Sequence, residues 1–261
     1  MRSSWTCSIL AGLTVLAGAS HAAAQDFQWH ARLAPGQTVE IKGINGDIQA
    51  TASSSGEVEV TAARTARRSN PADVRIEVVP HAGGVTICAV YPTVPGREPN
   101  TCEPGAGGKS NTRDNDTVVH FQVHVPYGVG LLARTVNGEI NAESLQGDVD
   151  ARTVNGSIRV ATTGLAIANT VNGSVNVTMG RADWPTGASF KTVNGGITLT
   201  LPAVFDADLR ADTLNGGITS DFPITVLGEV SPRRLHGTVG AGGRTLSLST
   251  VNGSIKLLRG Q

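Results

Sequence analysis

The sequence predicts an all-β protein, a parallel β-solenoid preceded by a strand-rich N-terminal region. Three observations predict this class. A Thr-Val-Asn-Gly motif repeats through the second half of the chain, and apolar and polar residues alternate through the first half. Aromatic residues make up only 4% of the 261 residues, while glycine is abundant at 32. This composition fits a thin, aliphatic and turn-rich fold better than a compact sandwich.

The first 24 residues predict a secretory signal peptide. Arg2 is its only formal charge, an apolar run covers residues 9–19, and small residues occupy 22–24. The apolar run is about half the roughly 20 residues that cross a bilayer, and no later stretch is long and apolar enough to do so. We therefore expect a mature chain that begins near Gln25, is exported to the periplasm or the cell surface, and has no membrane span.

The exported chain would keep two cysteines, Cys88 and Cys102. In an oxidising compartment they are expected to form a disulfide that closes a loop of about 15 residues and contributes roughly 3 kcal/mol. Two free thiols are the alternative. Without Arg2 the chain has 20 basic residues (21 minus 1) and 21 acidic ones. This balance gives no electrostatic reason to expect a nucleic-acid partner, and no motif predicts a cofactor.

The repeated motif sets the architecture of the second half. Full copies begin at Thr135, Thr153, Thr170, Thr192, Thr213 and Thr250, and a related corner covers residues 44–48. The first five Asn positions are separated by 18, 17, 22 and 21 residues, residues 235–239 resemble a degenerate copy, and a half-repeat such as 145–149 lies midway between copies. Each period is therefore expected to hold two strands and two turns. The expected structural corners are Asn137, Gly138, Asn155, Gly156, Asn172, Gly173, Asn194, Gly195, Asn215, Gly216, Asn252 and Gly253.

An Asn-Gly pair is also the strongest local signal for a β-hairpin, which makes the hairpin the alternative to a continuing coil. In a two-residue hairpin, Val136 and Ile140 would point to opposite faces, and every copy repeats this mismatch. If the chain bends at Asn-Gly and continues, the motif Val and Ile can both point inward while Thr and Asn point outward. We therefore expect an inner column of Val136, Val154, Val171, Val193, Leu214 and Val251 beside a column of Ile140, Ile158, Val175, Ile197, Ile218 and Ile255. Asn and Gly tolerate positive φ, which would allow the bends.

The first half reads as a separate β-rich region. Alternation predicts strands at 39–41, 58–60, 74–78, 85–87 and 119–125. A Pro- and Gly-rich loop, residues 91–116, separates the last two and should make few backbone hydrogen bonds. The expected division is a signal peptide (1–24), an N-terminal β-rich region (25–126) and the Asn-Gly repeat solenoid (127–261).

The pattern as a whole resembles the bacterial "putative adhesin" family, cell-envelope domains of unknown function with a β-solenoid-like body. The features that carry the resemblance are an exported start, alternating strands, a strand that ends at Val125-Pro126, rungs spaced by 17 to 22 residues, a Leu199–Pro202 rung and a final 248–255 strand. The resemblance covers roughly residues 27–258 and implies no catalytic residues. The Pro-rich insertion, with Cys88 and Cys102, is not part of the core pattern.

Two groups of side chains could in principle bind a metal ion or cleave a glycosidic bond. His120 and His124 alternate with apolar residues, which places them on one strand face about 13 Å apart, too far for one metal ion. The pairs Asp148/Asp150 and Asp206/Asp208 could support glycoside hydrolysis, but nothing nearby completes a site, and solvated carboxylates are the simpler interpretation.

Two surface features remain. The motif threonines would form an outward grid that could suit ice, a glycan or a protein, although strand propensity alone explains the row. A small basic cluster of Arg64, Arg67 and Arg68 could contact an anionic envelope polymer, but solvated charges near a turn are the simpler interpretation, and no role is assigned to it. The sequence therefore predicts a non-enzymatic envelope scaffold or adhesin-like protein whose partner is an envelope polymer, a glycan or a protein. A polysaccharide-cleaving enzyme on the same fold is the alternative, and the 91–116 loop is the expected contact site.

Overall fold

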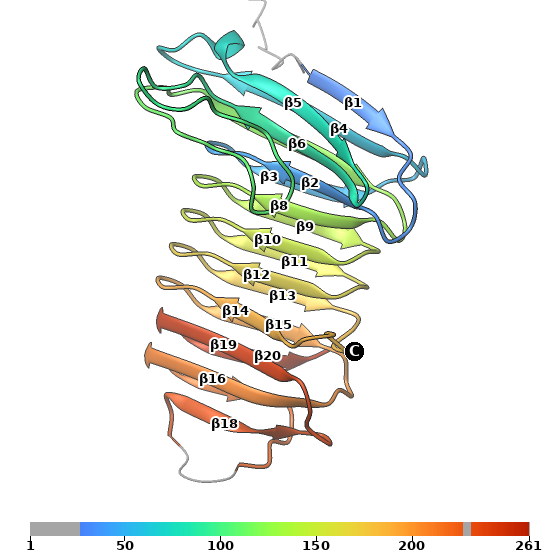
Figure 1. The fold of residues 1–261 in the computed structure, drawn as a ribbon. Coiled ribbons are helices and arrows are strands. Elements are labelled where there is room, and N and C mark those ends of the chain that lie inside the picture. The colour runs from blue at the N-terminus through green and yellow to red at the C-terminus, as the bar shows by residue number, and fades with distance from the viewer. Residues whose placement is uncertain (1–26, 227–230, 261) are drawn as a thin grey trace, which may run out of the picture.

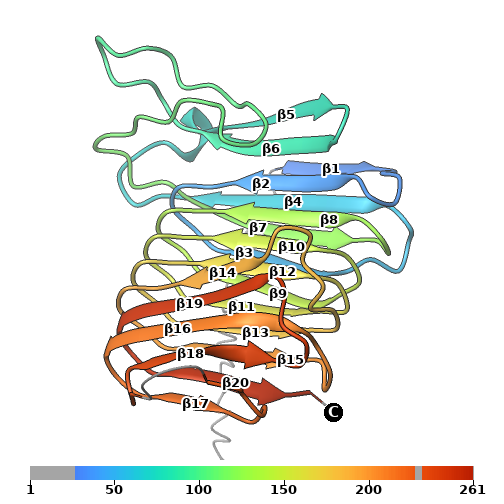
Figure 2. The ribbon, with the colours of Figure 1, turned by 60° about the horizontal axis from the view of Figure 1, so that its bottom comes forward.

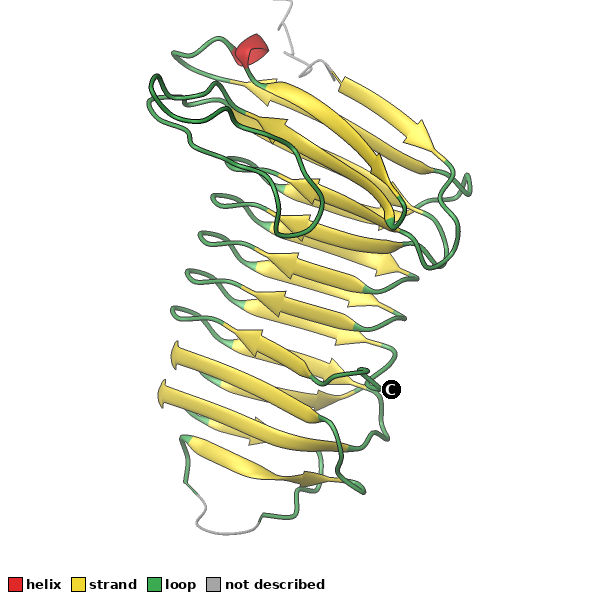
Figure 3. Ribbon diagram, in the orientation of Figure 1, coloured by secondary structure: helices red, strands yellow, loops and turns green. Residues whose placement is uncertain are grey.

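The computed structural model of the protein describes residues 27–226 and 231–260, and its regular secondary structure is almost entirely β-strand (Figure 3). Twenty strands form two ten-stranded sheets, called sheet A and sheet B, that face each other along an elongated body (Figure 1). One 3-10 helix, η1 (Pro71–Asp73), accompanies them in this part of the chain. The expected all-β class is confirmed. The signal peptide expected over 1–24 lies outside the described residues.

The spatial order of the strands in each sheet differs from their order in the chain. Sheet A contains, from one end to the other, β1 (Phe27–Ala31), β4 (Val58–Thr65), β7 (Val118–Val125), β3 (Ile48–Ala52), β9 (Ile140–Leu145), β11 (Ile158–Thr162), β13 (Val175–Met179), β15 (Ile197–Leu201), β20 (Ile255–Arg259) and β17 (Ile218–Ser220). Sheet B contains β18 (Arg234–Val239), β16 (Ala207–Asn215), β19 (Thr245–Asn252), β14 (Ala188–Lys191), β12 (Ala166–Asn169), β10 (Val149–Arg152), β8 (Gly130–Arg134), β2 (Thr38–Lys42), β6 (Gly84–Val90) and β5 (Arg75–His81). The five strands expected in the first half coincide with β2, β4, β5, β6 and β7.

From β8 to β17 the chain alternates between the sheets, and equivalent strands pair in parallel. In sheet A, β9, β11, β13 and β15 are parallel neighbours, as are β8, β10, β12 and β14 in sheet B. The connections between the sheets therefore lie stacked along both edges of the body (Figure 2). Both sheets also run through the expected boundary at residue 126, since β2 pairs with β8 and β3 with β9.

The last strand pair is stacked out of chain order. β19 lies between β14 and β16, and β20 lies between β15 and β17. Residues 235–239 are not a copy of the motif, because they lie in β18, which runs antiparallel to β16 at the end of sheet B. At the other end, β1, β4 and β7 pair antiparallel, as do β5 and β6. Within the described residues, no helix is long and apolar enough to cross a membrane.

The apolar core lies between the two sheets and includes one column of the motif as expected. Ile140, Ile158, Val175, Ile197 and Ile255 are at most 1% exposed, and Ile218 is partly buried at the end of the stack. These residues begin the sheet A strands, so their side chains fill the space directly behind each corner.

The Val and Thr columns of the motif lie on the opposite sides from those expected. The expected inner column is 36–60% exposed: Val136, Val154, Val171, Val193, Leu214 and Val251. The expected outer column is 4–7% exposed: Thr135, Thr153, Thr170, Thr192, Thr213 and Thr250. The assignment of these two columns from the sequence is therefore wrong, and the expected grid of hydroxyls for ice or glycan binding does not lie on the surface.

Hydrogen bonding explains why threonine takes the inner position. Each motif Thr hydroxyl donates to the carbonyl oxygen of a glycine in the neighbouring corner, for example from Thr153 to Gly138 at 2.9 Å and from Thr192 to Gly173 at 2.8 Å. A buried hydroxyl with a partner avoids the cost of an unpaired polar group. Thr is thus the last inward residue before the bend, and the Val that follows it points to solvent.

The Asn-Gly positions form a ladder along one edge of the body. Asn side-chain amides donate to one another at 2.7–2.8 Å in the order Asn45, Asn137, Asn155, Asn172, Asn194, Asn252 and Asn215. Glycine is required at the corners mainly because neighbouring corners approach each other too closely for a side chain. A Cβ on Gly156, for example, would lie 2.0 Å from the carbonyl oxygen of Gly138. Positive φ was the expected reason, but among the described corners it applies to Gly46 and Gly173 and to no Asn.

Candidate functional site

The outer face of sheet A carries a continuous row of polar side chains, which we call the polar row. Its members are in register across ten strands and alternate with inward apolar residues, as the two-residue period of a strand requires. None of them is buried. They are Gln28, Thr61, Gln122, Gln49, Asn141, Arg159, Asn176, Thr198, Lys256 and Thr219.

Two shallow hollows lie on this face, with volumes of about 360 and 410 Å³. They share Arg159 and Asn176, so they form one trough across β9, β11 and β13. The first hollow extends to Asp47 on the β3 side, and the second extends to Thr200 on β15. We call the combined feature the sheet A trough.

Carboxylates outnumber cations in the trough. Asp47, Glu139 and Glu143 line it with one guanidinium, that of Arg159. Asp47 Oδ1 accepts a hydrogen bond from the Glu139 backbone N–H at 2.8 Å, and Glu143 Oε1 accepts one from Asn141 Nδ2 at 3.0 Å. This charge disfavours a polyanion. Planar amides, carboxylates and a guanidinium suit the paired hydroxyls of a neutral sugar polymer, because each can bond two adjacent groups in one plane.

The 91–116 loop, the contact site expected from the sequence, is firmly held against sheet B. Cys88 and Cys102 form the expected disulfide. Asn100 is buried, and its Nδ2 donates to the carbonyl oxygens of Tyr91 and Asn111 at 3.0 and 2.9 Å. The Tyr91 hydroxyl donates to the carbonyl oxygen of Thr117 at 2.8 Å, and burial raises its pKa. Backbone-to-backbone hydrogen bonds within the loop are few, as expected. Side chains such as that of Asn100 supply the bonds that hold it, in place of a strand ladder.

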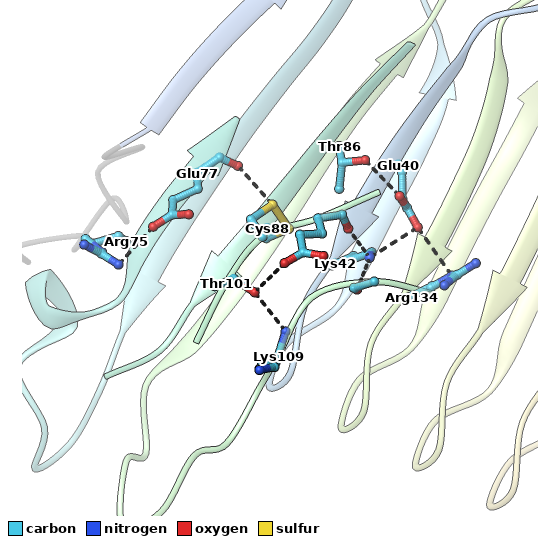
Figure 4. The surroundings of a disulfide bond; sticks show 12 residues. Glu40, Lys42, Arg75, Glu77, Thr86, Cys88, Thr101, Lys109 and Arg134 are labelled. Carbon is cyan, nitrogen blue, oxygen red and sulfur yellow. Dashed lines mark hydrogen bonds and ion pairs between the residues drawn. A yellow bond between two sulfur atoms is a disulfide. The ribbon is translucent and has the colours of Figure 1, made fainter. Parts of the chain in front are cut away.

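A buried carboxylate anchors the same loop (Figure 4). Glu40 is 3% exposed, and its Oε2 accepts hydrogen bonds from the Thr86 hydroxyl at 2.8 Å and the Gly105 backbone N–H at 2.9 Å. Its Oε1 lies 3.7 Å from Lys42 Nζ and 3.6 Å from Arg134 Nε. Both cations also donate to the carbonyl oxygen of Gly105, and desolvation lowers the pKa of Lys42. The hollow under the loop measures about 230 Å³, and Lys42, Asn100 and Arg134 in its lining are engaged in holding the loop.

The carboxylate pairs considered for hydrolysis are each used by the fold. Asp150 makes a bidentate pair with Arg152 at 2.8 Å and raises the pKa of that guanidinium through hydrogen bonding. Asp148 accepts from the Leu165 backbone N–H at 2.9 Å. Asp206 accepts from the Ala241 N–H at 2.7 Å, and Asp208 accepts from Thr238 in the neighbouring strand at 3.4 Å. These bonds hold turns and strands together.

The histidines lie apart along β7, as their spacing predicts. His120 lies near Asp47 at 3.5 Å, and His124 Nδ1 lies 3.0 Å from the Thr51 hydroxyl. Across residues 27–226 and 231–260, no three His, Cys, Asp or Glu side chains gather in a way that could hold a metal ion.

The small basic cluster lies at the base of the loop. The backbone N–H groups of Arg67, Arg68 and Ser69 donate to the Asp116 carboxylate, and the Arg68 guanidinium lies 3.8 Å from it. These hydrogen bonds, led by that from Ser69, lower the pKa of Asp116 to about 2. Arg64 donates to the carbonyl oxygen of Val74. The cluster thus closes a turn against the end of the loop.

Sequence reasoning missed the polar row. The signal was present, because the residue directly after the motif Ile is polar in every copy, as at Asn141, Arg159 and Asn176. Its importance depends on register, which places these residues side by side only once the sheet is known.

Neither a protein-family model nor a curated protein sequence matches the chain. Two crystal structures are similar to it. One is described as a "putative cell adhesion protein" from Clostridium sporogenes, with 11% identity and a TM-score of 0.45, over 90% of this chain and 99% of that one. The other is described as a "putative adhesin" from Bacteroides fragilis, with 12% identity and a TM-score of 0.31, over 89% of this chain and 96% of that one. The second description uses the name of the family that the sequence resembles, and the first names cell adhesion.

Proposed function

We propose that this protein is a non-catalytic, adhesin-like binding protein of the bacterial cell envelope, built as a β-solenoid and exported by the signal peptide expected over residues 1–24. Its partner would be an envelope polymer, specifically a neutral polysaccharide. The surface that would bind it is the sheet A trough with the polar row on either side of it.

The observation that carries this proposal is the uninterrupted register of the polar row. Ten strands at about 4.8 Å spacing present one polar side chain each, so the row repeats over a distance comparable to several sugar residues. A polymer lying across the strands would meet the same kind of hydrogen-bonding group at each step. Among the described residues, the exposed large hydrophobic side chains all lie outside this row, which favours a polar partner.

Solvent exposure and charge support a polysaccharide over the alternatives. A stable protein interface needs a dry core and buries about 800 Å² on each partner, usually with aromatic anchors, and the trough offers no such anchor. A polyanion would approach Asp47, Glu139 and Glu143 with only Arg159 to offset them.

Affinity electrophoresis in gels cast with purified polysaccharides tests the proposal. The test variant carries Asn141→Ala, Arg159→Ala and Asn176→Ala, on three adjacent strands of sheet A. The parent protein should be retarded by at least one neutral polysaccharide and not by a polyuronate. The variant should bind at least about tenfold more weakly, since each lost hydrogen bond contributes about 1 kcal/mol.

A matched control carries Asn169→Ala, Lys191→Ala and Ser249→Ala on three adjacent strands at the outer face of sheet B. It removes a similar set of side chains and should bind like the parent. Equal loss in both variants, or retardation by the polyuronate alone, would contradict the proposal.

A further inference from the structure

A separate hollow of about 390 Å³ lies on the edge of the body opposite the Asn ladder, where sheet A strands turn back into sheet B. It shares no residue with the sheet A trough. Successive turns line it, with Gly128 before β8, Gly147 before β10 and Gly164 before β12. Its volume falls in the range of about 300–1,000 Å³ that is typical of small-molecule sites.

Folding alone explains the glycine floor of this hollow. A Cβ on Gly147 would lie 2.1 Å from the carbonyl oxygen of Val129, and one on Gly164 would lie 2.7 Å from the carbonyl oxygen of Gly147. The stacked turns therefore leave no space for side chains there. The result is a recess that runs along the stack, with side chains only at its rim.

Tyr127 stands at that rim and is not explained by folding. Its side chain is 75% exposed, and it is the only aromatic among the exposed large hydrophobic residues of the described chain. Single exposed hydrophobic residues are common on protein surfaces. This one, however, borders a recess that is otherwise polar, so its ring offers the one flat apolar surface there.

The rim also carries polar groups with bonding capacity to spare. Asp148 uses Oδ1 to accept from the Leu165 N–H, and its Oδ2 makes no hydrogen bond with the described residues. Arg181 binds Asp183 through Nε and Nη2 at 3.0 and 2.8 Å, which leaves Nη1 able to donate. Gln146, Thr163 and Thr38 add an amide and two hydroxyl side chains to the lining.

We propose that this hollow binds a single pyranose ring of a saccharide. One face of a pyranose presents C–H groups, which would stack on the ring of Tyr127, since aromatic rings offer large apolar contact area. The hydroxyl edge of the sugar would donate to Asp148 and accept from Arg181. A carboxylate and a guanidinium in the lining of one hollow suit a group that both donates and accepts, which distinguishes a sugar hydroxyl from a simple anion.

Saturation-transfer difference NMR on the full chain tests this site with three probes: methyl β-D-glucopyranoside, methyl N-acetyl-β-D-glucosaminide and methyl β-D-glucuronide. At least one should receive saturation, mainly on the protons of one ring face. Tyr127→Ala should raise the dissociation constant of that probe about tenfold, as expected for a lost aromatic contact. Tyr127→Phe, which keeps the ring, should bind like the parent.

Val204→Ala is the control, because Val204 is 87% exposed and lies outside the hollow. It should leave the dissociation constant unchanged. The proposal is overturned if none of the three probes receives saturation, if Tyr127→Ala binds like the parent, or if Tyr127→Phe loses as much affinity as Tyr127→Ala. The variant with Asn141→Ala, Arg159→Ala and Asn176→Ala should bind the probe as the parent does. The monosaccharide test therefore stands apart from the polysaccharide test of the sheet A trough.

Discussion

The hydroxyl of Thr170 donates a 2.9 Å hydrogen bond to the backbone carbonyl oxygen of Gly156, which belongs to the preceding corner. The same bond joins Thr250 to Gly195 and Thr213 to Gly253, where the corners are neighbours in space but not in sequence. The Thr-to-Gly bond therefore joins corners that are adjacent in the stack, whether or not they are adjacent in the sequence. It makes the repeated motif a device for joining corners, which explains why Thr is buried and Val is not.

This relationship predicts how charge is tolerated at the corner. Thr170→Asp would bury an unpaired carboxylate and should lower the free energy of unfolding by about 3–5 kcal/mol. Val171→Asp introduces the same group at a side chain that is 39% exposed and should cost less than about 1 kcal/mol. Urea unfolding midpoints of the two variants measure the difference. A larger loss for Val171→Asp would show that the two columns are exchanged.

The disulfide predicts a second outcome. Thiol titration of the denatured, periplasm-derived protein should find no free thiol, and Cys88→Ser together with Cys102→Ser should lower the free energy of unfolding by about 2–4 kcal/mol. Two titratable thiols in the absence of reductant would contradict the bond.

The buried carboxylate of Glu40 predicts that the 91–116 loop is loosened when its charge is removed. Glu40→Gln removes the charge that faces Lys42 and Arg134, so the cations would lose their counter-ion and the Gly105 N–H its charged acceptor. Hydrogen exchange of the amides of residues 103–108 should become faster. Glu98→Gln, at an exposed pair with Lys109 in the same loop, should leave that exchange unchanged because exposed pairs contribute little. Equal exchange in both variants would show that Glu40 does not anchor the loop.

Asp116 predicts a pH dependence. Its pKa is lowered to about 2 from the usual 3.8, so its contribution to stability is fully present above about pH 4 and is lost as the pH falls towards 2. Asp116→Asn should therefore be less stable than the parent at pH 7, and the difference should shrink between pH 4 and 2. Unfolding curves at pH 7, 4, 3 and 2 measure this. A difference that stays constant over this range would mean that the carboxylate charge is not what holds the turn of residues 67–69.

The repeat in the sequence predicted strands, corners and the Ile column, because all three depend on local spacing along the chain. It could not predict that β19 lies between β14 and β16, because the spacing of the motif along the chain does not determine the order in which the strands stack. The Thr and Val columns were misplaced because polarity was weighed without the backbone carbonyl that accepts each hydroxyl. The anchoring of the loop by Glu40 and Asn100 depends on contacts between residues far apart in sequence, which local patterns do not contain.

The central claim, that the outer face of sheet A contacts a neutral polysaccharide, is tested most directly by a reporter on each face. In the chain from residue 25 onward, with the disulfide intact, an environment-sensitive fluorophore is attached to Thr198→Cys on sheet A or to Ser247→Cys on sheet B, both on outer faces. We predict that a polysaccharide that retards the parent protein shifts the emission at residue 198 in a saturable way and leaves residue 247 unchanged. A shift at 247 alone, or at neither position while the polymer is bound, would contradict the claim.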